Sequence, residues 1–85
     1  MWTNNTLAAA YYNHQMDGNS NVYASATYNR FRKAIENSPI DIQAYYLEHE
    51  NLDDLKVKLI GPGIRGILEK VLTDPYYEKY APKER

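Results

Sequence analysis

Apolar residues recur at helical spacing on both sides of a single Gly-Pro-Gly turn, within residues 51–72 of the chain. Before the turn, the spacing i, i+3, i+7 is occupied by Leu52, Leu55 and Leu59. After it, a similar spacing is occupied by Ile64, Ile67, Leu68, Val71 and Leu72. Both spacings are typical of amphipathic helices. The pattern therefore predicts two helices joined by a tight hairpin.

The residues at the hairpin ends support this interpretation. Asn51 can cap the first helix, and Asp53 and Asp54 lie in its first turn, where negative charge is favourable. Gly61 is expected to end that helix, because glycine adopts the left-handed C-terminal conformation without penalty. Gly63 then begins the second helix with unpaired backbone N–H groups. Such groups can bind phosphate, although the same turn also serves as an ordinary connection between packed helices.

The remaining pattern predicts three further helices and a tail. The first helix covers residues 7–16, with Asn5 or Thr6 as its cap, and a longer one covers residues 22–37. A short helix is expected in residues 41–50. Residues 76–80 are rich in tyrosine and are expected to fold back on the helices as a strap.

Together these elements predict an all-α fold, a compact bundle of four to five short helices that contains a helix-hairpin-helix. The 85 residues suffice for one domain with one small core, so residues 1–85 form a single domain. Residues 1–6 and 81–85 are expected to be flexible.

Composition limits the compartment and the chemistry. The chain has no cysteine, which excludes a disulfide framework and a cysteine zinc site and fits a reducing compartment. It has no apolar run of membrane-spanning length and no leader-like N-terminus, so we expect an intracellular protein (nucleus, cytoplasm or virion) that is neither secreted nor bound to a membrane. The nine tyrosines are expected to be mostly half-buried.

Candidate chemistry is sparse. His14 and His49 are isolated from other metal-ligating residues at suitable spacing, so no metal site is expected, and no nucleotide fingerprint or catalytic triad pattern indicates a cofactor. The net charge of −1 means that nucleic-acid binding would need a local basic patch. Arg30, Arg32 and Lys33 form the densest basic cluster. This cluster fits either a solvated helix face or a phosphate-facing stripe.

One stretch resembles a known family. Residues 28–34 read Tyr-Asn-Arg-Phe-Arg-Lys-Ala, and they are followed by Pro39 at the helix end and by the Gly-x-Gly hairpin. In this order the elements resemble the small N-terminal, lyase-type domain of family X DNA polymerases such as DNA polymerase beta. The resemblance covers roughly residues 7–72 and implies binding to gapped DNA or to 5′-phosphate ends.

The resemblance also implies roles for particular residues. Some family members remove a 5′ sugar-phosphate through a lysine Schiff base, and the corresponding position here is Glu69, or Lys70 if one residue is skipped. The tyrosine hydroxyl and the His-Lys pair of the family pattern are replaced by Phe31 and by Ala26-Thr27. The expected phosphate-binding residues are Arg30, Arg32, Lys33, Lys56, Lys58, Gly61, Gly63, Ile64, Arg65 and Lys70.

Three functions therefore remain open. The first is a DNA-binding module that grips the phosphate backbone without reading base sequence. The second is a structural or interaction protein of a larger assembly, such as a virion or a nucleoprotein complex, that binds a protein partner through its tyrosine-rich surface. The third is a 5′ sugar-phosphate lyase using Lys70.

Overall fold

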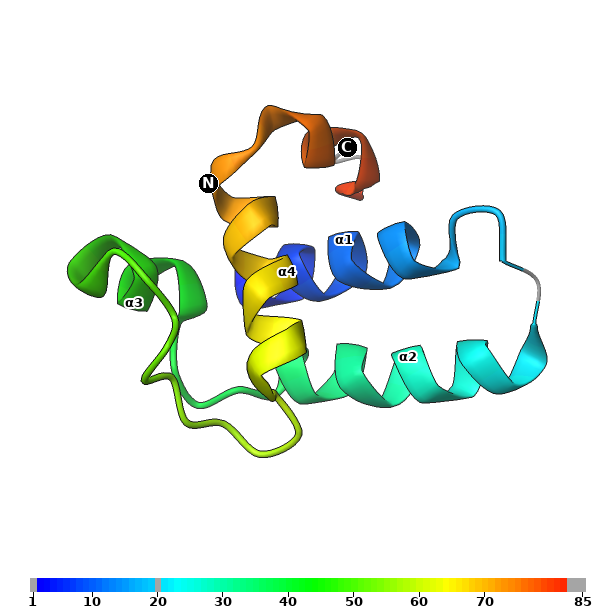
Figure 1. Ribbon diagram of the computed structural model, residues 1–85, viewed down its shortest axis with the longest axis horizontal. Helices are drawn as coiled ribbons and strands as arrows, with labels where there is room; N and C mark the ends of the chain where they lie inside the picture. The colour runs from blue at the N-terminus through cyan, green and yellow to red at the C-terminus, as the bar shows by residue number, and fades with distance from the viewer. Residues whose placement is uncertain (1, 20, 83–85) are drawn as a thin grey trace.

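The computed structural model describes residues 2–19 and 21–82. The helical elements of these residues are α1 (Asn4–Met16), α2 (Val22–Glu36), α3 (Ile42–His49), α4 (Pro62–Thr73) and the 3₁₀ helix η1 (Pro75–Tyr80). Helices α1 and α2 lie side by side and antiparallel, α4 crosses them near one end, and η1 covers α1 (Figure 1). Helix α3 stands at the far side of α4 (Figure 1). The prediction of a small all-α bundle is confirmed.

Side-chain caps explain where the first three helices begin. The side chain of Asn21 accepts hydrogen bonds from two N–H groups of α2, and the side chain of Asp41 accepts one from the N–H of Ala44 in α3. Helix α1 begins earlier than predicted, because Thr3 forms a reciprocal capping box with Thr6. Residues 4–6, expected to be flexible, are therefore the first turn of α1. Residues 1 and 83–85 of the predicted flexible ends lie outside the described residues.

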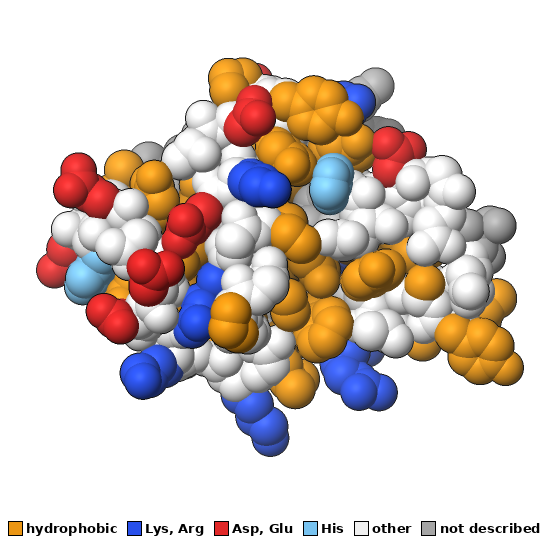
Figure 2. Space-filling model, viewed as in Figure 1, with side chains coloured by type: hydrophobic (Ala, Val, Ile, Leu, Met, Phe, Trp, Pro, Cys, Tyr) orange, Lys and Arg blue, Asp and Glu red, His pale blue; other side chains and the backbone are white. Residues whose placement is uncertain are grey.

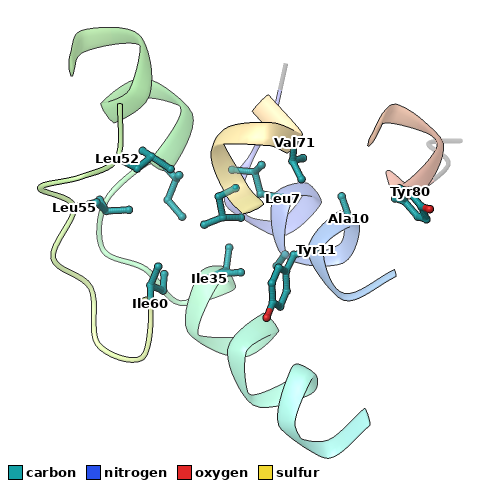
Figure 3. Close-up of a cluster of buried hydrophobic side chains, with 12 residues drawn as sticks. Leu7, Ala10, Tyr11, Ile35, Leu52, Leu55, Ile60, Val71 and Tyr80 are labelled. Atoms are coloured by element: carbon teal, nitrogen blue, oxygen red, sulfur yellow. The ribbon is translucent and has the colours of Figure 1, made fainter. Parts of the chain in front are cut away.

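Helix α1 is the centre of the core. It contains no Asp, Glu, Lys or Arg, and it packs against α2, α4 and η1. Figure 3 shows side chains of the segment between α3 and α4 pointing toward those of α1, α2 and α4. The buried cluster comprises Leu7, Ala8, Ala10, Tyr11, Ile35, Ile42, Leu52, Leu55, Ile60, Leu68, Val71 and Tyr80.

The first helix of the predicted hairpin does not form. Residues 50–61, which we call the α3–α4 loop, consist of turns and an isolated bridge between Val57 and Ile60. The side chain of Asn51 accepts a hydrogen bond from the N–H of Asp53, a local turn rather than a helix cap. In residues 55–59 apolar and lysine side chains alternate, and a period of two residues is typical of an extended chain. This signal competes with the helical spacing of the leucines. Only the second helix of the helix-hairpin-helix, α4, is present.

The tyrosine-rich tail folds back on α1, as predicted. Asn13 of α1 donates a hydrogen bond to the carbonyl of Tyr80 at 2.8 Å, and the hydroxyl of Tyr80 donates to Asp17 at 2.8 Å. Of the nine tyrosines, Tyr11 and Tyr80 are buried, Tyr23 and Tyr76 are exposed, and the other five are half-buried. None of the helices in residues 2–19 and 21–82 combines the length and apolar character needed to cross a membrane.

Candidate functional site

The N-terminus of α4 presents two free backbone donors, the N–H groups of Gly63 and Ile64. Gly61 has φ −87° and is the N-cap of α4, not the left-handed end of a preceding helix, and no side chain caps this terminus. Pro62 occupies the first helical position, where its missing N–H has no intrahelical partner to lose. The N–H of Arg65 already bonds to the carbonyl of Gly61 at 2.9 Å. The N–H groups of Gly63 and Ile64 have no acceptor within the helix.

The Arg65 side chain is committed to the fold. Its Nη1 donates a hydrogen bond of 3.1 Å to the carbonyl of Leu55, and the side chain is half-buried. The guanidinium was expected to be the charged partner of a phosphate at the hairpin tip. In the structure it ties the α3–α4 loop to α4 instead.

Glu69 and Lys70, the two positions considered for a lyase nucleophile, lie on different sides of α4. The carboxylate of Glu69 accepts a hydrogen bond from the N–H of Leu52 at 2.7 Å, so it holds the loop. Lys70 is exposed and therefore lacks the burial that would favour a neutral amine. It is also eight residues beyond Pro62, or about 12 Å along the helix axis. Lys70 is therefore distant, along α4, from the backbone donors at the start of this helix.

The basic cluster of α2 is divided by an ion pair. Arg32 bonds to Asn29 through Nε at 2.9 Å and Nη2 at 2.6 Å, and it forms an ion pair with Glu36. Its guanidinium also lies 5.8 Å from the ring centre of Tyr12. The charge of Arg32 is thereby neutralised within the helix. Arg30 and Lys33 have exposed side chains.

A hollow of about 340 Å³ lies where the C-terminal end of α2 meets the α3–α4 loop. We call this the lysine-rimmed hollow, and it is lined by Ala34, Asn37, Pro39, Lys56, Val57, Lys58 and Leu59. On α2, Arg30 is one turn before Ala34, and Lys33 is one turn before Asn37. The hollow therefore continues the face of α2 that carries these two cations. We call the four exposed side chains Arg30, Lys33, Lys56 and Lys58 the basic edge.

Charge is segregated on the molecular surface. Figure 2 shows Lys and Arg side chains along one edge, over α2 and the α3–α4 loop, and Asp and Glu side chains over α3. Between Glu36 and Lys56 the chain has no Lys or Arg. The exposed acidic residues of this stretch are Asp41, Glu48, Glu50, Asp53 and Asp54. The local positive charge at the basic edge is consequently greater than the net charge of −1 indicates.

One wall of the hollow has an unusual backbone. Leu59 has φ 71°, and its side chain is 47% exposed. A bulky residue at positive φ is an outlier that marks a turn under strain. Sequence reasoning identified the lysines but missed the hollow, because it placed residues 51–60 on a helix. The alternation of residues 55–59 was the signal that could have shown an extended segment there.

Both histidines pack against tyrosine rings. The His14 ring lies 4.9 Å from the ring of Tyr77 and 5.1 Å from that of Tyr80, and its buried Nδ1 has no hydrogen-bond partner. The His49 ring stacks on Tyr45 at 4.0 Å. Within the described residues, no three His, Asp or Glu side chains group as a metal site would require.

Comparisons of the chain with protein-family models, with curated proteins and with solved structures found no match. The basic edge, the lysine-rimmed hollow and the N-terminus of α4 are therefore the observations on which a function can be argued.

Proposed function

We propose that the chain is a DNA-binding module that holds the phosphate backbone without reading base sequence. The observation that carries the proposal is the basic edge, in which Lys56 and Lys58 line one hollow and two further exposed cations, Arg30 and Lys33, lie on the face of α2 that leads to it. Lysine and arginine side chains supply most of the sequence-independent affinity for DNA. The resemblance of residues 28–34 to the N-terminal domain of family X DNA polymerases supports the same substrate.

The N-terminus of α4 adds a short-range component. Lys58 precedes Gly63 by five residues, so the free N–H groups of Gly63 and Ile64 lie next to the basic edge along the chain. The uncapped helix end carries partial positive charge, and no acidic residue occupies its first turn. A phosphate could therefore receive backbone hydrogen bonds at this end while the lysines neutralise its neighbours.

The test is fluorescence anisotropy with a gapped DNA duplex that carries a 5′ phosphate, titrated at about 50 and 200 mM salt. Four phosphate contacts predict that the affinity falls about 100-fold between these salt concentrations. Absence of binding at the lower salt would overturn the proposal.

Charge-matched variants locate the site. Lys56→Glu and Lys70→Glu change the net charge equally, but only Lys56 belongs to the basic edge. We expect Lys56→Glu to weaken binding at least 10-fold and to lower the salt dependence, and Lys70→Glu to weaken binding less than 3-fold. Equal losses in both variants would mean that DNA responds to overall charge and not to this edge.

A second role, contact with a protein partner, is supported by two exposed apolar side chains at the start of α2. Val22 is 78% exposed and Tyr23 is 85% exposed. Tyrosine is enriched among residues that dominate binding energy at interfaces. Affinity capture with the wild type and with Tyr23→Ser would test this role, and a protein retained equally by both would argue against it.

A further inference from the structure

The end of α3 presents an uncovered apolar side chain within acidic surroundings. Leu47 is 71% exposed. Ala44 is three residues before it and therefore lies on the same side of α3, Glu48 is its neighbour, and Glu50 is the C-cap residue that ends the helix. All three are exposed, as are Asp53 and Asp54 in the turn that follows. We call Ala44, Leu47, Glu48 and Glu50 the acidic knob.

The lysine-rimmed hollow has the opposite character. Its apolar lining comes from Ala34, Pro39, Val57 and Leu59, and its charged lining from Lys56 and Lys58. Hollow and knob thus match in both polarity and charge, with an apolar centre and opposite charges at the rim. Figure 2 shows the corresponding basic and acidic surfaces on different parts of the molecule.

We propose that the acidic knob of one copy of this chain docks into the lysine-rimmed hollow of a second copy. Leu47 would enter the hollow, and Glu48 and Glu50 would face Lys56 and Lys58. A second copy is the occupant that the chain itself supplies, because each molecule carries both complementary surfaces. The proposal goes beyond DNA binding and does not depend on it.

The geometry of such a contact is head to tail. Knob and hollow are different surfaces of the molecule, so the interface is heterologous, and each added copy leaves one knob and one hollow unoccupied. Association therefore extends beyond a dimer unless the rotation closes a ring. Because Lys56 and Lys58 belong to both surfaces, DNA and the knob would compete for the hollow.

The strained wall of the hollow supports a role in contact. Leu59 remains half-exposed at a positive φ, although this conformation is unfavourable for its side chain. Strain of this kind is retained where the surrounding structure over-determines a residue, often at binding surfaces. Here the conformation keeps an apolar side chain at the edge of the hollow.

Sedimentation equilibrium of the full chain tests the proposal. One leucine and a few surface charges make a small interface, so self-association is expected at protein concentrations on the order of 0.1–1 mM in low salt. The weight-average mass should rise above the monomer value of 9.9 kDa and fall again as salt is added. A wild-type chain that remains monomeric at about 1 mM in low salt overturns the proposal.

Two variants distinguish a head-to-tail contact from any other. Leu47→Asp removes the knob, and the double variant Lys56→Glu/Lys58→Glu removes the hollow, so each alone should remain monomeric. Mixed in equal amounts they should form a dimer and nothing larger, because the intact hollow of the first accepts the intact knob of the second. Tyr76→Asp, which alters another exposed apolar residue, is the matched control and should associate like the wild type.

The outcomes separate this proposal from DNA binding. Leu47→Asp should lose self-association and keep DNA affinity, whereas the double lysine variant should lose both. A Leu47→Asp chain that associates like the wild type, or a mixture that forms no dimer, overturns the head-to-tail contact. If the wild type fails to bind DNA, the sedimentation result is unaffected.

Discussion

The carboxylate of Glu69, on α4, accepts a hydrogen bond of 2.7 Å from the backbone N–H of Leu52, 17 residues earlier. One turn before Glu69, the side chain of Arg65 donates to the carbonyl of Leu55. Two side chains of α4 thus satisfy backbone groups of the α3–α4 loop, where no regular secondary structure pairs them. Glu69, which the family resemblance would align with a lyase nucleophile, serves here to hold a loop.

Replacement of Glu69 tests how much this contact stabilises the fold. Glu69→Ala leaves the N–H of fully buried Leu52 without an acceptor, which we expect to lower the free energy of unfolding by about 1–3 kcal/mol. Glu69→Gln keeps a side-chain oxygen and should lose less. Urea unfolding measures both, with Lys70→Ala as a control that should stay within about 0.5 kcal/mol of the wild type. A Glu69→Ala chain as stable as that control would contradict the assignment.

Two substitutions at Leu59 measure the backbone strain in the hollow wall. Leu59→Ala and Leu59→Gly both remove the apolar side chain, but only glycine adopts the observed φ of 71° without penalty. The glycine variant should therefore be more stable than the alanine variant by about 1 kcal/mol. Thermal or urea unfolding gives the difference. Equal stability of the two variants would show that Leu59 is unstrained.

Tyr11 predicts a loss of stability at alkaline pH. Burial, with a smaller contribution from neighbouring Tyr28, raises the pKa of Tyr11 to about 12 from its ordinary value of 10.0. Between these values the unfolded chain releases the proton and the folded chain retains it, so the free energy of unfolding falls as the pH rises from about 10 to about 12. The difference between the two pKa values sets an upper limit of about 3 kcal/mol on this loss of stability.

The matched variant for this effect is Tyr11→Phe, which keeps the ring and removes the ionisable hydroxyl. Hydrogen bonds with Tyr76 and Asp17 also raise the pKa of Tyr80, so part of the alkaline loss should persist in the variant. We expect the stability of Tyr11→Phe, measured by urea unfolding at several pH values, to fall less steeply above pH 10 than that of the wild type. Parallel curves would rule out the contribution of Tyr11.

The strap formed by η1 can be weakened by removing one hydroxyl. Tyr80→Phe keeps the ring on α1 and loses the hydrogen bond to Asp17, so we expect the free energy of unfolding to fall by about 1 kcal/mol. The hydroxyl of exposed Tyr76 makes only a 3.5 Å contact, so Tyr76→Phe is the control and should change stability little. A double-mutant cycle with Asp17→Ala, which removes the acceptor, isolates the pair, and additive effects would show that the two groups are not coupled.

Helices with strong local signals were predictable from the sequence. The side chains of Asn21 and Asp41 cap backbone N–H groups no more than three residues away. The break at residues 17–19 likewise depends on neighbouring residues alone. The buried residues Leu7, Ala10 and Tyr11 of α1 recur at spacings of three and four residues, a period that the sequence makes visible. In these cases the nearby residues and the final packing favour the same conformation.

The α3–α4 loop could not be predicted in the same way. Leu52 and Leu55 are buried, as expected. The hydrogen bonds that hold their backbone groups come from the side chains of Glu69 and Arg65, which are distant in sequence. Local spacing carries no information on such contacts. The hollow was missed for the same reason, since it exists only because the loop passes the end of α2.

The sequence identifies the basic residues, but it does not show which of them have free side chains and which are bound to other groups of the protein. Arg30, Lys33, Lys56 and Lys58 are exposed, which suits the proposed contacts. Arg32 is occupied by an ion pair, and the i, i+4 spacing to Glu36 was a visible sign of it. The state of Arg65 depends on the loop and had no comparable signal.

The attachment of η1 to α1 has a consequence for synthesis on the ribosome. Asn13 and Asp17 contact Tyr80 across 67 and 63 residues, so α1 emerges from the exit tunnel long before its last partner is made. Until then the nascent chain can pair α1 with α2 but leaves one side of an uncharged helix without its cover. The final fold is therefore completed only after the segment through Tyr80 has left the tunnel, and chaperones that bind apolar helices would meet α1 during that interval.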